Sequence, residues 1–543
     1  MNDSDGETDH TRFGDPSDGE RAADAAAVVD VDGENLTIAD VVAVARDGAK
    51  VSLAARAREA LARSRALVEE IVARGDTIYG VNTGFGDLSS VSIPADQLSQ
   101  LQHNLLRSHS AGVGPPLPRD VVRGMLLLRA NALAKGYSGV RPVVVERLLE
   151  LLNAGVTPVV PAQGSVGASG DLASLAHLSL VLLGEGFATI DGESEPMPGG
   201  DALSRAGLEP LELTAKEGLA LINGTQQMAA MGALALHDAE VLLQSAEVAA
   251  AVSLEALRGT DVPFDAEIQA VRPHPGQMRV AKRIRSLLAE SDILASHRDR
   301  AVDPRVQDPY SLRCTPQVLG ASWDAIGYVR RVLEIELNSA TDNPLCFPVD
   351  SSELTEANYG RVLSGGNFHG QPLALALDFL KIAVAEISNI SERRTYLMLD
   401  PFRSGLPAFL SPTPGVQSGF MIAQYTAAAL VSENKGLAHP ASVDSIPTSA
   451  GMEDHVSMGP IAARGAASII ANATRVVAIE LLCASQGVEQ HQPLRPGVGV
   501  VAAVERLRSV VPRLTHDRML SPDIERVAEL IKAGELRLGE FGA

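Results

Sequence analysis

Long helical patterns dominate the second half of the chain and constrain its fold more than any other feature. In the best marked of them, Thr315 is a predicted N-cap, Pro316 takes the first helical position, and Leu319, Trp323 and Leu333 share one apolar face. We expect helices over residues 224–257, 278–296, 316–339, 371–399, 417–438, 455–489 and 522–533. With no convincing repeat or linker between them, the sequence predicts a mainly α protein built on a long-helix bundle.

The first half of the chain predicts shorter elements. Residues 1–28 are rich in Asp, Glu, Gly, Ser and Thr and offer little to bury, so we expect a disordered acidic tail. Helices are predicted at residues 38–46, 53–73, 101–108, 133–154 and 172–183, and an exposed excursion with turns at 186–213. We therefore divide the chain into a tail (1–28), an N-terminal region (29–222) and a region of long central helices and C-terminal helices (223–543).

A stretch rich in glycine and serine, residues 164–171, precedes the predicted helix at 172–183. Two glycines flank Ala168 and Ser169, so the backbone can fold back where bulkier residues would clash. Because Gly170 lacks a β-carbon, its nitrogen can be pressed against the Ala168 carbonyl. Ring closure, loss of water and dehydration of Ser169 would then give a five-membered ring with an exocyclic methylidene, an electrophile made from the chain alone.

Taken by itself, Ala-Ser-Gly is more often an ordinary loop, here one that caps the next helix through Asp171. The context favours the ring, because several ordered blocks resemble the aromatic amino acid ammonia-lyases and, within them, the histidine-specific branch. The matching blocks are residues 79–86, 168–171, 223–226, 307–314, 365–369, 391–394, 432–435 and 453–458. The resemblance covers the chain from about Tyr79 to Gln490.

The resemblance implies both a prosthetic group and a reaction. In this family the Ala-Ser-Gly triplet becomes 4-methylideneimidazole-5-one (MIO), which would form here from Ala168, Ser169 and Gly170 without an external cofactor. The reaction implied is the non-oxidative deamination of L-histidine to trans-urocanate and ammonia, the first step of histidine degradation. The family also packs its long helices into a homotetramer, so we expect composite active sites that each draw on three subunits.

Four residues are assigned to the reaction itself or to the substrate backbone by the resemblance. Tyr79, in the glycine-rich loop 79–86, becomes the base that removes the β-proton, although a phenol with an ordinary pKa near 10 needs a polar or cationic environment to ionise. Arg313 can present its planar fork to the substrate α-carboxylate. Tyr310 and Gln307 would orient the amine and the carboxylate.

The remaining assignments surround the substrate ring. By resemblance, His109 meets the substrate side chain, Asn223 polarises the MIO ring or holds the substrate, and Phe368 lines the pocket. The carboxylate of Glu453 can accept an N–H bond from imidazole but not from a phenyl ring, which favours histidine as substrate. Before Glu453 this chain has Gly451-Met452 where the family usually has Asn-Gln, so a possible hydrogen bond near the pocket is lost.

Several alternatives remain open on the sequence. The same scaffold serves tyrosine or phenylalanine ammonia-lyases and 2,3-aminomutases, and a scaffold that has lost catalysis would be a helical binding or structural protein. Glu453 could instead be a helix N-terminal residue that interacts with the helix dipole. The sequence also does not separate addition of the substrate amine to the electrophile from attack by the imidazole ring.

The composition limits partners and compartment. A net charge of −21 and a pI near 5.0 argue against nucleic acid or an anionic membrane as partner. Three cysteines without paired spacing indicate neither disulfides nor a zinc site, so no metal is expected and a reducing cytoplasm fits best. No apolar run approaches the roughly 20 residues that span a bilayer. Acid excess with scarce lysine is typical of a high-salt cytoplasm, although a GC-rich genome can supply the same arginine bias.

Overall fold

The computed structural model describes residues 28–84, 93–167, 169–193, 195–299, 301–303, 305–349 and 360–539. The predicted tail lies outside these residues except for its last residue, and Ala168 lies outside them as well. Within the described ranges the chain is mainly helical, with strands of two to four residues in small sheets, so the predicted fold class is confirmed.

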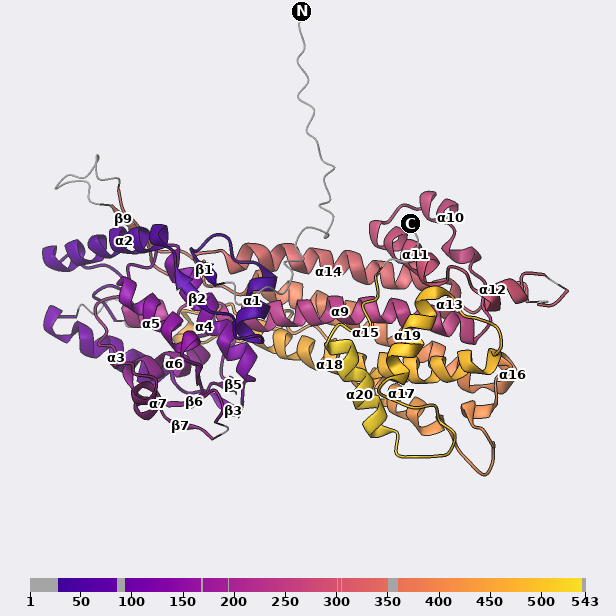
Figure 1. The fold of residues 1–543 in the computed structure, drawn as a ribbon. Helices are drawn as coiled ribbons and strands as arrows, with labels where there is room; N and C mark the ends of the chain where they lie inside the picture. The colour runs from indigo at the N-terminus through magenta and orange to yellow at the C-terminus, as the bar shows by residue number, and fades with distance from the viewer. Residues whose placement is uncertain are drawn as a thin grey trace, which may run out of the picture.

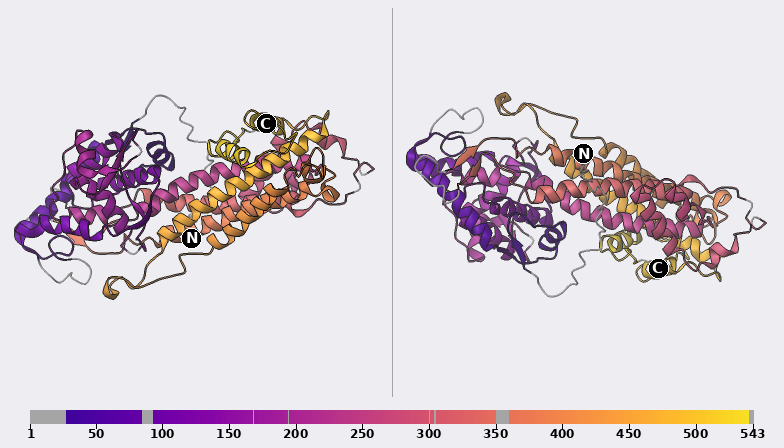
Figure 2. Two further views of the ribbon diagram at one scale, coloured as in Figure 1. Left: turned by 90° about the horizontal axis from the view of Figure 1, so that it is seen from below. Right: turned by 90° about the horizontal axis from the view of Figure 1, so that it is seen from above.

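Four long helices form the body of the molecule and give it an elongated shape (Figures 1 and 2). They are α9 (Gln226–Ala256), α14 (Thr315–Leu337), α15 (Gln371–Leu399) and α18 (Gly459–Val488). Most side chains of α9 are buried on all sides, as expected for a helix at the centre of a bundle. The helix at 459–491 is apolar and long enough to cross a membrane, but it is largely buried among its neighbours, as a core helix is.

A smaller body of short elements covers one end of the bundle (Figure 1). Its helices are α1 (Ile38–Ala45), α2 (Ala55–Arg74), α3 (Leu98–His109), α4 (Arg119–Ala134), α5 (Pro142–Asn153), α6 (Leu172–Leu180), α7 (Gly199–Arg205) and α8 (Glu217–Ile222). β1 (Val29–Val31) pairs in parallel with β2 (Val51–Leu53). The antiparallel strands are β3 (Val113–Pro116) with β5 (Pro161–Gln163), β4 (Val156–Pro158) with β6 (Phe187–Ile190) and β7 (Met197–Pro198), and β8 (Leu345–Phe347) with β9 (Arg361–Leu363).

The remaining helices lie along the bundle and around its other end (Figure 1). They are α10 (Ala266–Ala270), α11 (Pro275–Leu287), α12 (Asp292–Ser296), α13 (Tyr310–Arg313), α16 (Pro401–Ser404), α17 (Met421–Leu437), α19 (Val498–Arg508) and α20 (Ser521–Lys532). Short 3-10 helices are η2 (Ala95–Gln97), η3 (Val181–Leu183), η4 (Val262–Phe264), η5 (Ala408–Leu410), η6 (Ser449–Gly451) and η7 (Glu489–His491).

Some predicted elements are wrong in detail. The helix expected at 133–154 is the end of α4 and all of α5, separated by a loop in which Gly136 and Gly139 have φ of 80° and 68°. A β-carbon on Gly139 would collide with Val68, so packing against α2 fixes this break. The helix expected at 278–296 is likewise divided, and Cys314 rather than Thr315 is the N-cap of α14.

The segment 186–213 is not the exposed excursion that its turn residues predicted. It contains β6, β7 and α7, and Ala188, Leu203 and Leu213 are fully buried. Its turns connect elements that belong to the smaller body of short elements, here called the N-terminal body, so they do not lead away from it.

Candidate active site

The loop that ends in Ser169 and Gly170 is pressed against the turn before α9. Gly170 has a φ of 74° and forms a parallel bridge with Gly224, and the Asp171 backbone N–H donates to the Gly224 carbonyl at 2.6 Å. A β-carbon on Gly170 would collide with that carbonyl, so both the conformation and the contact require glycine. The sharp bend expected from the sequence is therefore present at Gly170.

Asp171 links the two loops, although not in the way that a simple cap of α6 would. Its side chain makes no capping bond to α6; Oδ2 instead accepts the backbone N–H groups of Gln227 (2.8 Å) and Met228 (3.1 Å) in the first turn of α9. Ser165 Oγ donates to Oδ1 at 3.2 Å. Burial raises the pKa of Asp171 to about 7, against the opposing effect of these three donors.

The Ser169 hydroxyl faces Glu453, a residue 284 positions away in the chain. Ser169 Oγ donates to Glu453 Oε1 at 2.8 Å, and Thr448 Oγ1 donates to Glu453 Oε2 at 2.8 Å. Glu453 pairs with Thr448 in an isolated bridge, and α18 begins only at Gly459, so the reading of Glu453 as a helix N-terminal residue is wrong. The side chain of Met452 is largely exposed in this chain.

His109 ends α3 close to the same carboxylate. Its Nδ1 lies 2.9 Å from the Leu105 carbonyl oxygen. Burial lowers the pKa of His109 and outweighs the raising effects of that carbonyl and of the Glu453 charge. The structure thus brings Ser169 and Glu453 into contact, with His109 near enough for the Glu453 charge to raise its pKa.

Asn223, at the end of α8, is held rigidly and is only 4% exposed. Its Nδ2 donates to the Asn343 carbonyl at 2.9 Å, and its own carbonyl accepts from Arg129 Nη1 at 2.9 Å. Within the described residues, Asn223 Oδ1 has no hydrogen-bond partner. A buried amide oxygen without a partner is costly, so Asn223 Oδ1 is an acceptor available to a group bound at this position.

Two other predicted residues lie at this end of the bundle. Tyr79 is half-buried in the turn after α2, and the adjacent Gly80 packs so closely that an added β-carbon would lie 2.8 Å from both Leu219 Cδ2 and Pro344 Cδ. Phe368 is also half-buried, in a turn before α15 that is tied to the glycine-rich loop by the bond from the Gly370 N–H to the Gly167 carbonyl (3.3 Å).

Gln307, Tyr310 and Arg313 lie at the opposite end of the bundle, where α13 is drawn in Figure 1. Gln307 and Tyr310 are exposed, while Arg313 Nε donates to the Asp308 carbonyl at 3.0 Å and its guanidinium lies 4.5 Å from the Tyr310 ring centroid. The backbone N–H of Thr260, just beyond α9, donates to Asp308 Oδ2 at 2.7 Å. This loop is therefore fixed to the C-terminal end of α9.

The two groups of predicted site residues are consequently separated by the length of α9. Asp171 binds the first turn of that helix and Asp308 binds the segment that follows its last turn. A helix of 31 residues spans about 45 Å, far more than any side chain can reach. A single chain does not bring Arg313 to Ser169.

Comparison with known proteins decides the family. Residues 36–509 match the family model described as aromatic amino acid lyase. The chain belongs to the aromatic amino acid lyase family. Lyases of this family are MIO-dependent and need no external cofactor. In this lyase, the glycine-dependent bend at Gly170 and the Ser169 hydroxyl fit such a ring formed from the chain. The unpartnered Oδ1 of Asn223, which precedes Gly224, the bridge partner of Gly170, fits it as well.

Individual relatives of this lyase cover nearly its whole length. Histidine ammonia-lyase of Deinococcus radiodurans is 57% identical over 92% of this chain and 93% of that protein. The crystal structure of histidine ammonia-lyase from Trypanosoma cruzi is 45% identical with a TM-score of 0.86, covering 94% of each chain. Tyrosine aminomutase from Streptomyces globisporus is 40% identical with a TM-score of 0.87, covering 94% of this chain and 98% of that one.

The sequence did not predict the residues that hold the candidate site residues in position. Ser165, Arg129, Thr448 and Asn343 hold the predicted residues through contacts between distant segments. For one further pair of supporting residues, Lys216 and Glu217, the sequence did contain a signal. They are adjacent charged residues just before an apolar helical segment, and charged side chains buried at such a place require partners of opposite charge.

Proposed function

We propose that this lyase deaminates L-histidine to trans-urocanate and ammonia, the first step of histidine degradation. The observation that carries the proposal is the carboxylate of Glu453 at 2.8 Å from Ser169 Oγ, with His109 near enough for the Glu453 charge to oppose the lowering of its pKa by burial. An imidazole substrate offers an N–H to that carboxylate, whereas phenylalanine and tyrosine offer no ring N–H. The 57% identity to a histidine ammonia-lyase supports the same substrate.

The roles of the side chains follow from their chemistry. MIO supplies the electrophile that turns the substrate amine into a better leaving group. Formation of the ring removes the Ser169 hydroxyl, so Glu453 Oε1 loses its present donor and becomes free to accept a substrate N–H. Tyr79 removes the β-proton as general base, and Asn223 Oδ1 acts on the ring or the substrate. Phe368 lines the pocket.

Arg313 binds the α-carboxylate, and Tyr310 and Gln307 orient the amine and the carboxylate. Since these residues lie about 45 Å from Ser169 along α9 of the same chain, they must come from another subunit. We therefore propose a homotetramer with composite sites. Exposed apolar side chains on neighbouring helices support it, because they would be covered in an oligomer: Phe379 and Ile382 on α15, and Ile422 and Tyr425 on α17.

We also propose that the enzyme works in the cytoplasm, without nucleic acid, membrane or metal partners. Its cysteines Cys314, Cys346 and Cys483 are free, which fits a reducing compartment. The net charge of −21 with few lysines favours a cytoplasm of high salt.

An assay of the purified protein with three amino acids tests the proposed reaction. We expect ammonia release together with urocanate absorbance from L-histidine, and much slower release from L-tyrosine and L-phenylalanine. A preference for tyrosine or phenylalanine, or formation of a β-amino acid, would assign the scaffold to another lyase or to an aminomutase. No turnover of any of the three, together with no MIO absorbance, would identify an inactive scaffold.

Replacing Glu453 tests how the substrate is chosen. We expect Glu453→Gln to lower kcat/KM on L-histidine about 100-fold or more, because a buried polar group loses a charged partner. Residual activity on L-tyrosine or L-phenylalanine should fall much less. Near-ultraviolet absorbance checks that the ring still forms, and an equal loss on all substrates would reject Glu453 as the residue that recognises imidazole.

Replacing Tyr79 tests the general base. Tyr79→Phe keeps the aromatic side chain and its packing but removes the ionisable hydroxyl. We therefore expect kcat to fall by about 100-fold or more with little change in substrate binding. Steady-state kinetics on L-histidine measure both quantities. An unchanged kcat would remove Tyr79 from this role.

A further inference from the structure

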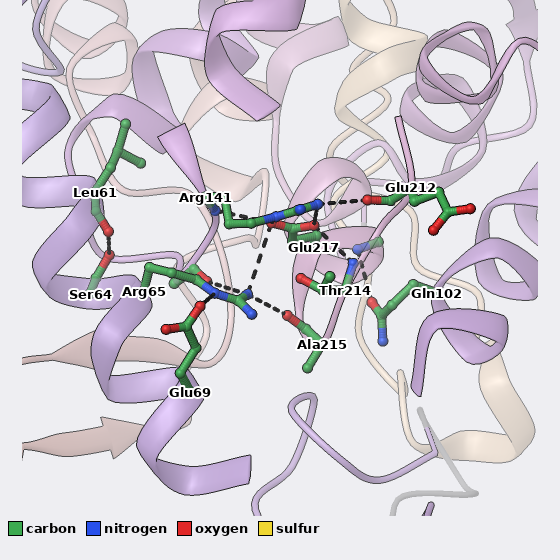
Figure 3. A network of polar contacts seen from close by, with 12 residues as sticks. Leu61, Ser64, Arg65, Glu69, Gln102, Arg141, Glu212, Thr214, Ala215 and Glu217 are labelled. Carbon is green, nitrogen blue, oxygen red and sulfur yellow. Dashed lines mark hydrogen bonds and ion pairs between the residues drawn. The ribbon is translucent and has the colours of Figure 1, made fainter. Parts of the chain in front are cut away.

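Two adjacent charged residues at the start of α8 are fully buried, and each has a partner of opposite charge. Arg141 donates to Glu217 from Nε to Oε1 and from Nη2 to Oε2, both at 2.8 Å (Figure 3). Lys216 Nζ donates to Asp342 Oδ2 at 2.8 Å, and both side chains are 0% exposed. These two pairs fix the N-terminal end of a helix that ends at Asn223.

The Lys216–Asp342 pair is connected to the Asn223 amide on both sides, through hydrogen bonds from Asp342 and through helix α8 from Lys216. Asp342 Oδ1 accepts the backbone N–H of Asn343 at 2.7 Å, and the Asn343 carbonyl accepts from Asn223 Nδ2 at 2.9 Å. The path returns to Lys216 through the six residues of α8. The ion pair therefore holds Asp342 at a set distance from Lys216. The Asn343 carbonyl, which orients the Asn223 amide, is next to Asp342 in the chain and is held in place with it.

Stability alone is a weak reason for such a pair. Removing two charges from water costs about as much as their attraction returns, so apolar residues of similar size often stabilise a core as well or better. A buried ion pair does, however, hold the two segments that carry it in one relative position. Here it holds Asn343 in position against Asn223, which is 120 positions away in the chain.

We propose that Lys216 and Asp342 are positioning residues for the reaction, which hold the Asn343 carbonyl where it orients the Asn223 amide. With Nδ2 engaged by that carbonyl, Oδ1 is the amide atom left for the ring or the substrate. The inference rests on the proposed function, in which Asn223 acts at the site. It assigns to this ion pair an effect on turnover that passes through Asn223.

A mutant cycle tests this path. Lys216→Met with Asp342→Asn removes both charges together and keeps an acceptor for the Asn343 N–H. We expect this pair variant to fold, to keep its near-ultraviolet absorbance, and to lose about 100-fold in kcat, since small displacements of a catalytic group cost that much. Asn223→Ala should lose at least as much. In the Asn223→Ala background, the same pair replacement should change kcat less than about twofold, because the affected group is already absent.

A second buried ion pair supplies the matched control. Glu247 on α9 pairs with Arg283 on α11 at 2.8 Å, at a place where neither residue contacts a candidate site residue in the described contacts. Arg283→Met with Glu247→Gln should leave kcat within about twofold, whatever its effect on thermal stability. Lys216→Gln with Asp342→Asn, which also removes both charges together but lets the two amides hydrogen-bond, repeats the cycle should the pair variant fail to fold.

The outcomes separate this inference from the proposed function. Inactivity of the wild-type protein on L-histidine would overturn the proposed function. The mutant cycle can still be measured with whichever substrate the wild-type protein does turn over. Losses that multiply in the Asn223→Ala background, or a pair variant with wild-type kcat, would overturn the positioning role. Loss of the near-ultraviolet absorbance in the pair variant would overturn it too, since the pair would then act on ring formation.

Discussion

A protein with Ser169→Ala is expected to remain folded but to lose both the near-ultraviolet absorbance of MIO and all measurable turnover of L-histidine. The serine side chain supplies the methylidene carbon, and alanine has no hydroxyl to eliminate. The substitution removes one hydrogen bond to Glu453, so little stability should be lost. Absorbance, intact mass and the histidine assay, measured on the same sample, check each part of this expectation.

Ser179→Ala is the matched control, because Ser179 is a fully buried serine on the neighbouring helix α6 that touches no candidate site residue in the described contacts. It should keep the absorbance, the mass loss of ring formation and the turnover. Full activity of Ser169→Ala, or equal losses in both variants, would remove the assignment of MIO to residues 168–170.

The long helices were predictable because their apolar spacing is regular over many turns. The helix expected at 371–399 is confirmed as α15, and the one at 224–257 is α9 to within two residues. Helix ends in the N-terminal body were less predictable. The break between α4 and α5 depends on Gly139 packing against Val68 of α2, a contact that periodicity within one segment does not contain.

The candidate site was predictable where it consists of short motifs and not where it depends on contacts between distant segments. The motifs supplied Ser169, Glu453 and His109, which the structure brings together. The bonds from Asp171 to the first turn of α9 and from Asn223 to Asn343 join loops that only the folded chain places side by side. The motifs themselves did not show the separation of Arg313 from Ser169, although the long helix predicted at 224–257 and the composite sites implied by the resemblance agree with it.

That separation makes a strong prediction about mixed oligomers. Ser169→Ala leaves Arg313 intact, and Arg313→Met leaves Ser169 intact, so each variant alone should form tetramers without a complete site. When the two chains are co-expressed with different tags and assemble at random, about a quarter of the sites should combine an intact Ser169 from one chain with an intact Arg313 from another.

The most direct test of a site shared between subunits is therefore the histidine ammonia-lyase activity of such mixed tetramers, purified through both tags. We expect two inactive chains together to recover roughly a quarter of the wild-type urocanate formation per site, with near-ultraviolet absorbance in proportion to the chains that carry Ser169. Mixed tetramers that remain inactive, or an Arg313→Met protein that is fully active by itself, would contradict a site assembled from the two ends of different chains.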